Sequence, residues 1–274
     1  MLPEIGRLRE ICFRAAGEGT GRSRDLDRFD QWYKHLFVWN AEREEIVSAY
    51  RIGMADSILA ERGPRGLYTS TLFKFELSFL NGLGPALELG RSFVRLEYQR
   101  DYQPLLLLWK GITKFVAAHP KYRRLFGAVS ISNDYHAISR ALIVEFCKAR
   151  RDPGIARSVR PRHPFQSSSI AGHNRSLLSS LAEDVAELSS LIADLEPDKK
   201  GVPVLLRQYL NLGGSVLEFN LDPHFANAVD GLILVDLLKA DRRLLERYMG
   251  REALAAFYQF HDRPPQLATN IAGA

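Results

Sequence analysis

The sequence has 274 residues, of which 46% are hydrophobic and 25% charged, and its formal net charge is +5. These are globular averages, so wholesale disorder, collagen-like repeats and fibrous proteins are excluded. Cys12 and Cys147 are the only cysteines, which excludes a disulfide framework and any Cys-x-x-Cys zinc pair. The charged N-terminus predicts no signal peptide, and no apolar run approaches the ~20 residues of a spanning helix. We expect a soluble, intracellular protein, and the positive charge suits anionic partners.

The first half of the chain alternates helical and extended patterns. Apolar residues at helical spacing predict a helix over 2–15, and a glycine-rich loop, AGEGTGRS, follows. HLFVWN and EIVSAYRIG predict an antiparallel hairpin, and MADSILAERG predicts a short helix that ends at Gly63. GLYTSTLFKF and ALELGRSFV are predicted strands. A helix is then expected to begin near Pro104 and to stop before Pro120.

The second half continues the alternation. RLFGAVSIS predicts a strand, and a helix with Ser132 as its N-cap follows. Residues 148–163 carry six Lys/Arg against one acid and precede a serine-rich stretch, so an excursion is expected near 148–175. An apolar stripe from Leu181 to Leu195 and the segment VPVLLRQYLNLG predict further helices.

Two late strands, GSVLEFNL and AVDGLILVDL, and an amphipathic helix near 241–260 close the predicted order. Because strands and helices alternate along the chain, the pattern predicts an α/β fold with a mixed sheet. We expect a single domain over 1–262 and a flexible tail over 263–274.

Three groups of polar residues interrupt these predicted elements. Asp27 and Asp30 follow the glycine-rich loop, Arg51 lies in the hairpin, and Glu88 and Arg91 lie in ALELGRSFV. A polar turn explains the two aspartates equally well, and an exposed strand position explains Arg51. A structural explanation is harder to give for Glu88, because an acid within an apolar strand must be exposed, paired or functional. A carboxylate beside a glycine, where a ligand can approach the backbone, is a candidate general base.

The order and spacing of these groups resemble the acyl-homoserine-lactone synthases, through Arg9-x-x-x-Phe13, Asp27-x-x-Asp30, Tyr50-Arg51 and Glu88-x-Gly-Arg91. The chain resembles more closely the GNAT-fold N-acyltransferases of ornithine-lipid and related aminolipid synthesis, through HLFVWN, EIVSAYRIG, ALELGRSFV, LLLLWKGI and VPVLLRQYLNLGG. It also resembles the GNAT half of bifunctional proteins that begin with a lysophospholipid O-acyltransferase. No histidine here has an aspartate five positions on, so we do not expect the O-acyltransferase activity on this chain.

The resemblance implies a GNAT-like, mainly antiparallel central sheet flanked by helices, with extra C-terminal helices. It also implies transfer of a long-chain acyl group from a thioester to the amino group of an amino acid. Glu88 would then be the catalytic base, and Arg91 would orient it or hold the acceptor's carboxylate. Asp27 and Asp30 would bind the ammonium group, with Arg51 organising both carboxylates.

The same resemblance implies the rest of the site. Arg9 and Phe13 would line the pocket, and a backbone N–H near Phe93 or Val94 would meet the oxyanion. An acyl tunnel would be lined by Leu89, Leu107 and Phe126 together with Phe93, although ordinary core packing explains each of these residues as well.

The segment after the central strand favours acyl carrier protein as the donor over CoA. VRLEYQRDYQPLLLL has no glycine, and Pro104 lacks an N–H, so a pyrophosphate-binding loop is not expected. The acidic carrier would suit the net charge and the basic run 148–162, which a solvated connector explains equally well. No permanent cofactor, no metal and no nucleic-acid partner are expected. The expected location is cytoplasmic or peripheral at the inner face of the membrane.

Two alternatives stay open from the sequence. One is a signal synthase of the acyl-homoserine-lactone type, which requires S-adenosylmethionine chemistry. The other is a non-catalytic GNAT-like module that partners a membrane acyltransferase.

Overall fold

A six-stranded sheet forms the centre of the protein, in the order β1-β2-β4-β5-β8-β7. The computed structural model describes residues 1–166 and 182–262, so the serine-rich part of the predicted excursion and the predicted tail lie outside the described residues. The strands are β1 (Lys34–Asn40), β2 (Glu45–Met54), β4 (Ala86–Val94), β5 (Arg124–Ile131), β7 (Ser215–Asp222) and β8 (Ala228–Asp236). The small sheet pairs β3 (Phe73–Phe75) with β6 (Val159–Pro161).

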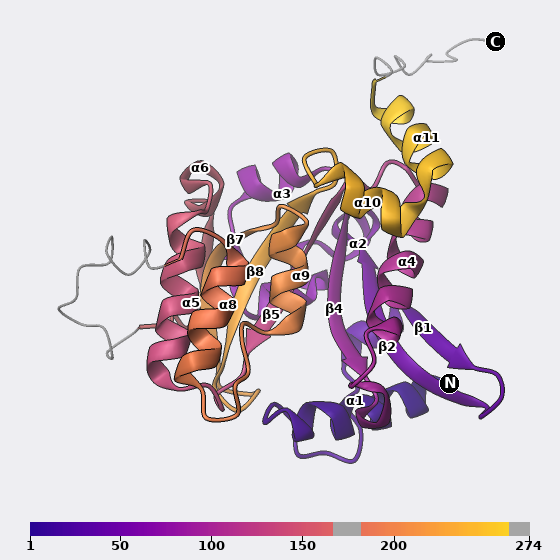
Figure 1. Cartoon of the computed structure of the whole chain (residues 1–274). Coiled ribbons are helices and arrows are strands. Elements are labelled where there is room, and N and C mark those ends of the chain that lie inside the picture. The colour runs from indigo at the N-terminus through magenta and orange to yellow at the C-terminus, as the bar shows by residue number, and fades with distance from the viewer. Residues whose placement is uncertain (167–181, 263–274) are drawn as a thin grey trace, which may run out of the picture.

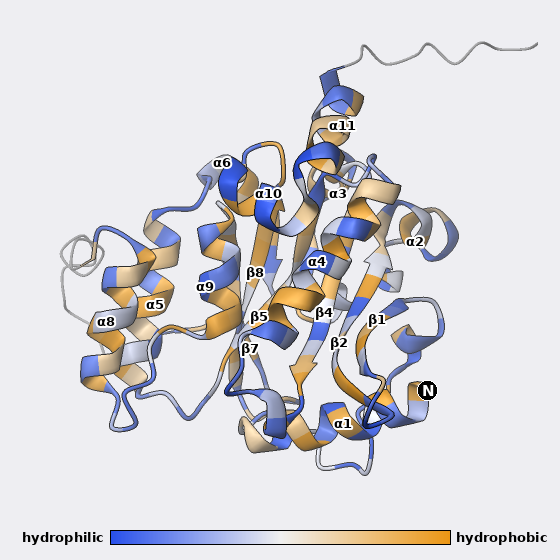
Figure 2. Ribbon diagram, turned by 45° about the vertical axis from the view of Figure 1, so that its right-hand side comes forward, coloured by the Kyte–Doolittle hydropathy of each residue, from blue (hydrophilic) through white to orange (hydrophobic). Residues whose placement is uncertain are grey.

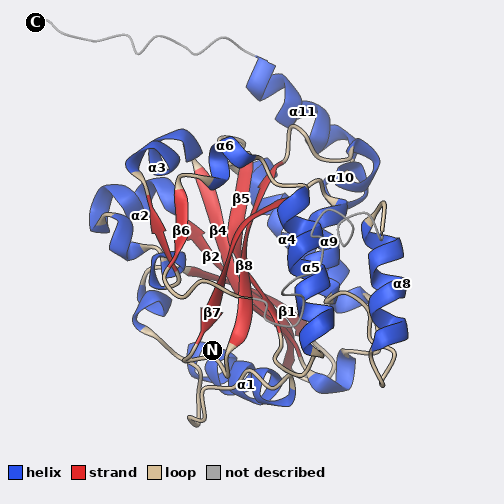
Figure 3. Ribbon diagram, turned by 90° about the vertical axis from the view of Figure 1, so that its left-hand side faces the viewer, coloured by secondary structure: helices blue, strands red, loops and turns tan. Residues whose placement is uncertain are grey.

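Helices cover both faces of this sheet (Figures 1 and 3). On one side lie α4 (Gln103–Ala118), α5 (Ala137–Ala149), α8 (Val185–Leu195), α9 (Val204–Asn211) and α10 (Arg242–Met249). On the other lie α2 (Ala55–Arg62), α3 (Leu77–Leu83), α6 (Pro153–Ala156) and the β3–β6 sheet. α1 (Leu2–Ala15) packs at one end of β4, and α11 (Arg251–Asp262) follows α10.

The inner strands are apolar because they are covered on both sides. β5 and β8 are hydrophobic along much of their length, whereas β4 carries a hydrophilic stretch (Figure 2). No helix within 1–166 or 182–262 is long and apolar enough to cross a membrane. The sheet is antiparallel except between β4 and β5, which confirms the mixed, mainly antiparallel α/β fold with C-terminal helices.

The two parallel strands separate soon after they meet. β4 pairs with β5 only from Ala86 to Glu88, whereas β5 stays paired with β8 as far as Ile131. Gly127 lies where the separation begins, and a Cβ on it would lie 2.0 Å from the carbonyl oxygen of Leu89. Only glycine therefore permits this close approach, beyond which the space between β4 and β5 opens.

A bulge in β4 lies beside this opening. Ala49 of β2 pairs with Phe93 and Arg51 pairs with Gly90, so two residues of β4 lie opposite one of β2. Arg91 is one of the two, and its φ of 51° is in the left-handed region that a non-glycine residue rarely adopts. Such strain is concentrated at functional sites.

Most predicted elements are confirmed, including the first helix, the hairpin, the helix that ends at Gly63 and the two late strands. GLYTSTLFKF was expected to be one strand, but it forms a 3-10 turn, Tyr68–Thr71, and then β3. Ser132 is not an N-cap, because α5 begins after His136 and the Ser132 hydroxyl donates to the Ala16 carbonyl. The expected C-terminal helix is two helices that Gly250 separates.

Candidate active site

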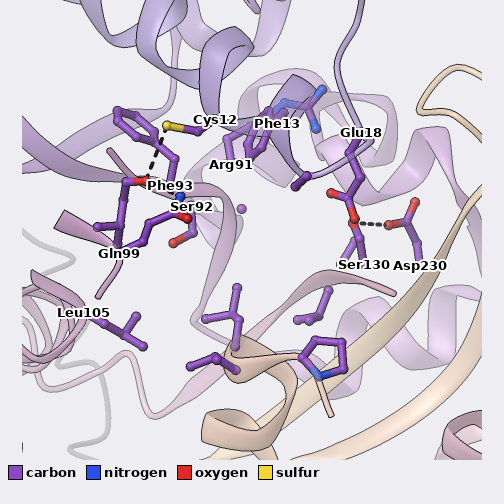
Figure 4. A pocket seen from close by; sticks show the side chains of 18 of the residues that line it. Cys12, Phe13, Glu18, Arg91, Ser92, Phe93, Gln99, Leu105, Ser130 and Asp230 are labelled. Carbon is purple, nitrogen blue, oxygen red and sulfur yellow. Dashed lines mark hydrogen bonds between the residues drawn. The ribbon is translucent and has the colours of Figure 1, made fainter. Parts of the chain in front are cut away.

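A cavity of ≈ 610 Å³ lies in the opening between β4 and β5 (Figure 4). Residues 90–94 of β4 form one wall and residues 128–130 of β5 form the other. The end of α1 and the loop after it, the segment 99–105, the start of α9 and the β7–β8 hairpin complete the lining. The cavity is therefore built from segments distant in sequence, which the splayed sheet brings together.

One end of the cavity is acidic. Glu18, Asp222 and Asp230 line it together with Arg91 and Tyr68. Asp230 on β8 is 4% exposed, and its Oδ1 accepts a hydrogen bond of 2.8 Å from the Ser130 hydroxyl on β5. Figure 4 shows Glu18, Ser130 and Asp230 together at this end of the cavity. This end therefore suits a cationic group such as an ammonium ion.

The middle of the cavity is apolar. Phe13 packs edge-on against Phe225 at 5.4 Å between ring centroids, and Phe93, Leu105 and Val129 continue the wall. A largely apolar cavity with a few polar groups at one end is typical of a site for an amphipathic small molecule.

The other end opens to solvent. Tyr102 and Val204 line the cavity there and are 39% and 50% exposed. Arg100, Asp101 and Arg207 lie in the same part of the lining, so its net charge is positive. The cavity thus runs from a basic mouth, past an apolar middle, to an acidic inner end.

The predicted polar residues do meet, but most lie behind the cavity wall. In the segment after the glycine-rich loop, the Asp27 side chain accepts from the Phe29 N–H and the Asp30 side chain accepts from the Asp27 N–H, so the pair caps a 3-10 turn. Arg9 donates to Asp30 at 2.8 Å. Arg51 donates to Asp27 at 2.7 Å and to Asp30 at 3.2 Å.

Arg9 and Arg51 are each 1% exposed, and neither they nor the two aspartates line the cavity. Burial raises the pKa of Asp30, but the Arg9 hydrogen bond and the Arg51 charge outweigh it, so the pKa lies below its ordinary value. These four residues form a network of ion pairs and hydrogen bonds that supports the wall. Their predicted contact with substrate has no support in this arrangement.

Arg91 connects this network to the cavity. Its guanidinium forms an ion pair of 2.9 Å with Asp25, lies 3.8 Å from Asp27 and donates to the Tyr68 hydroxyl at 2.7 Å. It also lies over the ring of Phe225, 5.0 Å from the centroid. Arg91 is therefore held in place from behind and lines the cavity, where a bound carboxylate can meet it.

Glu88 is 1% exposed and is not part of the cavity lining. Its carboxylate accepts from the Tyr33 hydroxyl, from the Thr69 N–H at 2.6 Å and from the Tyr68 N–H at 3.2 Å. Burial raises its pKa, and the hydrogen bonds from Tyr33 and Thr69 oppose that rise. The role of general base remains a prediction for Glu88, and the position of its side chain behind Tyr68 gives that role no support.

The residues predicted to stabilise the oxyanion line the cavity, whereas most of those predicted to form the acyl tunnel do not. Phe93 and Val94 line the cavity, and the Val94 carbonyl accepts from Cys12 Sγ at 3.4 Å (Figure 4). The three other tunnel residues do not line it. Leu89 and Phe126 belong to the packed core, and Leu107 lies on the outer side of α4 with 45% exposure. The periodicity of α4 places Leu105, two positions earlier, on the cavity side instead.

The basic run 148–162 does not line the cavity. Arg150 donates to the carbonyls of Phe146, Ala182 and Glu183, and Arg151 bonds the Leu217 carbonyl and the Glu218 carboxylate. These two arginines therefore hold the chain together, which favours the connector interpretation.

Glu18, Ser130 and Asp230 are the cavity residues that sequence reasoning missed. Two sequence features mark the two acids: Glu18 is a lone acid in a glycine-rich loop, and Asp230 lies inside the apolar strand AVDGLILVD. The second is the same signal that singled out Glu88. Neither feature marks Ser130.

The sequence matches the family described as acetyltransferase (GNAT) domain over residues 8–110. A glycine N(alpha)-acyltransferase of Bacteroides thetaiotaomicron is 34% identical, with 89% of this chain and 76% of that protein covered. An L-ornithine N(alpha)-acyltransferase of Rhodobacter capsulatus is 27% identical, with 83% and 80% covered.

Among solved structures, a CoA-dependent acyl-homoserine lactone synthase aligns over 94% of this chain and 91% of that one, with 12% identity and a TM-score of 0.42. That likeness is too distant to carry an argument about chemistry. The sequence match to the Bacteroides enzyme, which covers most of both chains, is sufficient by itself to show the family. The chain belongs to the family of GNAT-domain N-acyltransferases that contains the Bacteroides enzyme.

Proposed function

We propose that this protein transfers a long-chain acyl group from an acyl carrier protein thioester to the amino group of an amino acid, in aminolipid synthesis. The observation that best supports this proposal is the cavity between β4 and β5, which is basic at its mouth, apolar in its middle and acidic at its inner end. Each part suits one part of the two substrates. The names of the relatives support an amino-acid acceptor, and glycine is the first to test.

The mouth suits the donor. Acyl carrier protein and CoA both carry the thioester on a phosphopantetheine arm, and its phosphate would lie near Arg100 and Arg207. Pro104 in the first turn of α4 and the lack of a glycine-rich loop there favour the carrier protein over CoA. The acidic carrier also matches the net charge of +5.

The middle and inner end suit the reacting groups. The acyl chain would lie along Phe13, Phe93 and Leu105, which places the thioester beside the bulge of β4. Backbone N–H groups of Phe93 and Val94 would stabilise the oxyanion there. Arg91 would hold the acceptor's carboxylate.

The test is direct. The protein is incubated with long-chain acyl carrier protein, or with the matching acyl-CoA, and with glycine, ornithine or lysine, and N-acyl products are measured by mass spectrometry. We expect an N-acyl amino acid and faster turnover with the carrier protein. No N-acyl product with any amine, while the thioester stays intact, would contradict the proposal. An acyl-homoserine lactone formed only with S-adenosylmethionine would favour a signal synthase instead.

A further inference from the structure

The two acids at the inner end of the cavity come from opposite walls. Glu18 lies in the loop after α1, and Asp230 lies in β8 next to Ser130 of β5. Within 1–166 and 182–262, no side chain or backbone N–H donates a hydrogen bond to the Glu18 carboxylate, and the Ser130 hydroxyl alone donates to Asp230. Asp230 is 4% exposed and lines the cavity, and no donor among the described residues reaches its second oxygen.

The surrounding charges do not neutralise this pair. Glu18 faces Asp230, Arg91 and Asp134, and Asp230 faces Asp222 and Arg91. Arg91 lowers the pKa of both acids, but by less than burial raises it, and Arg91 is also paired with Asp25. A cation that enters the cavity, such as the ammonium group of an acceptor, would be drawn to this end.

Both acids titrate near neutral pH. Burial raises the pKa of Asp230 to about 7. The charge of Asp222 adds to this rise, and the hydrogen bond from Ser130 opposes it. Burial and the charge of Asp230 raise the pKa of Glu18 to about 8. A group whose pKa lies close to the working pH both accepts and releases a proton readily, as general base catalysis requires.

We propose that Asp230 is the general base of the acyl transfer and that Glu18 is its positioning partner, which holds the ammonium group against it. This inference rests on the proposed function. Asp230 takes one proton from the ammonium group, and the freed lone pair forms the N–C bond to the thioester carbonyl carbon. When the tetrahedral intermediate collapses, the C–S bond breaks with its electron pair on sulfur. The remaining extra proton on nitrogen passes to that sulfur, so the products are an amide and a thiol.

The first test compares Asp230→Asn with Asp236→Asn. Both change an aspartate of β8, but Asp236 is paired with Arg123 and Arg124 outside the cavity. We expect Asp230→Asn to lower kcat by about 10²–10⁴-fold at pH 7, with the KM for the donor unchanged, and Asp236→Asn to keep the wild-type kcat. The deficit of Asp230→Asn should shrink as the pH approaches the pKa of the free amine, because the acceptor then arrives deprotonated.

The second test separates a chemical role from a structural one. Glu18→Gln should raise the KM for the amine more than it lowers kcat, whereas Glu42→Gln, an exposed change, should alter neither. A wild-type kcat in Asp230→Asn would overturn the inference while the N-acyl product of the wild type leaves the proposed function standing. A loss in Asp230→Asn that is equal at every pH and accompanied by lost donor binding would also overturn it, because that pattern indicates altered folding.

Discussion

Two carboxylate sites lie on either side of the Tyr68 segment, and they differ in the number of hydrogen-bond donors that they have. Glu88 accepts from a hydroxyl and two backbone N–H groups and is sealed from the cavity. Asp230 and Glu18 face the cavity with a single donor between them. Both settings raise the pKa, but a carboxylate whose oxygens are all occupied holds structure, whereas one with a free oxygen can exchange protons with a ligand.

The largest expected effect on stability comes from the network of Arg51, Asp27 and Asp30, which does not line the cavity. Arg51→Met removes the cation that Asp27 and Asp30 share and leaves Arg9 alone to pair with the buried Asp30. We expect the free energy of unfolding to fall by about 3–5 kcal/mol, measured by urea denaturation. Arg43→Met, a change on the exposed turn between β1 and β2, is the control and should leave stability unchanged. A loss below 1 kcal/mol in Arg51→Met would mean that the network does not support the wall.

Glu88→Gln should cost less. The amide still accepts through its oxygen, but its NH₂ group faces a backbone N–H, so one donor is left unsatisfied. We expect a loss of about 1–3 kcal/mol in the free energy of unfolding, read from thermal and urea denaturation. Unchanged stability combined with a strong loss of kcat would reverse the assignment and return the base role to Glu88.

At the site of Asp230 and Glu18, which faces the cavity, we expect a substitution to raise the stability of the protein. Because the pKa values of Asp230 and Glu18 are raised in the folded protein, the folded state binds more protons than the unfolded one between pH 4 and 8. This contribution to stability is fully present below the unfolded pKa values and is lost as the pH rises through about 7 to 8. Asp230→Asn should therefore be more stable than the wild type at pH 8.5, and the difference should shrink toward pH 4.

The smallest expected effect concerns the mouth. Arg100→Glu with Arg207→Glu should raise the KM for acyl carrier protein several-fold at low salt and less at high salt, because screening weakens exposed charges. Arg157→Glu, on the basic run away from the cavity, serves as the matched control. An equal effect of Arg157→Glu would restore the predicted carrier site on that run.

The sequence predicted the fold well because periodicity and glycine positions are local signals. The helix over 2–15, the hairpin and the strand ALELGRSFV follow directly from their patterns. GLYTSTLFKF was misassigned because its aromatic and β-branched residues favour a strand, whereas Tyr68 and Thr69 turn their N–H groups to Glu88. Tertiary hydrogen bonds overrode local propensity there.

The site was harder to predict than the fold. The resemblance placed Arg51 with Asp27 and Asp30, as the structure does, but it placed Arg9 in the pocket lining, whereas Arg9 bonds Asp30 outside that lining. Spacing alone cannot tell a side chain in the cavity from one behind its wall. Asp230 lies two hundred residues from the loop that contains Glu18, and only the splay of β4 from β5 brings the two together.

The pH dependence of kcat/KM for the amine, measured side by side in Asp230→Asn and Glu88→Gln, tests the central claim most directly. We expect Glu88→Gln to keep the fall in rate below about pH 7, at reduced stability. Asp230→Asn should lose about 10²–10⁴-fold in rate at pH 7, and the pH at which its rate levels off should move from about 7 toward the pKa of the free amine. A profile that still levels off near pH 7 in Asp230→Asn, but is shifted in Glu88→Gln, would contradict the assignment of Asp230 as the base.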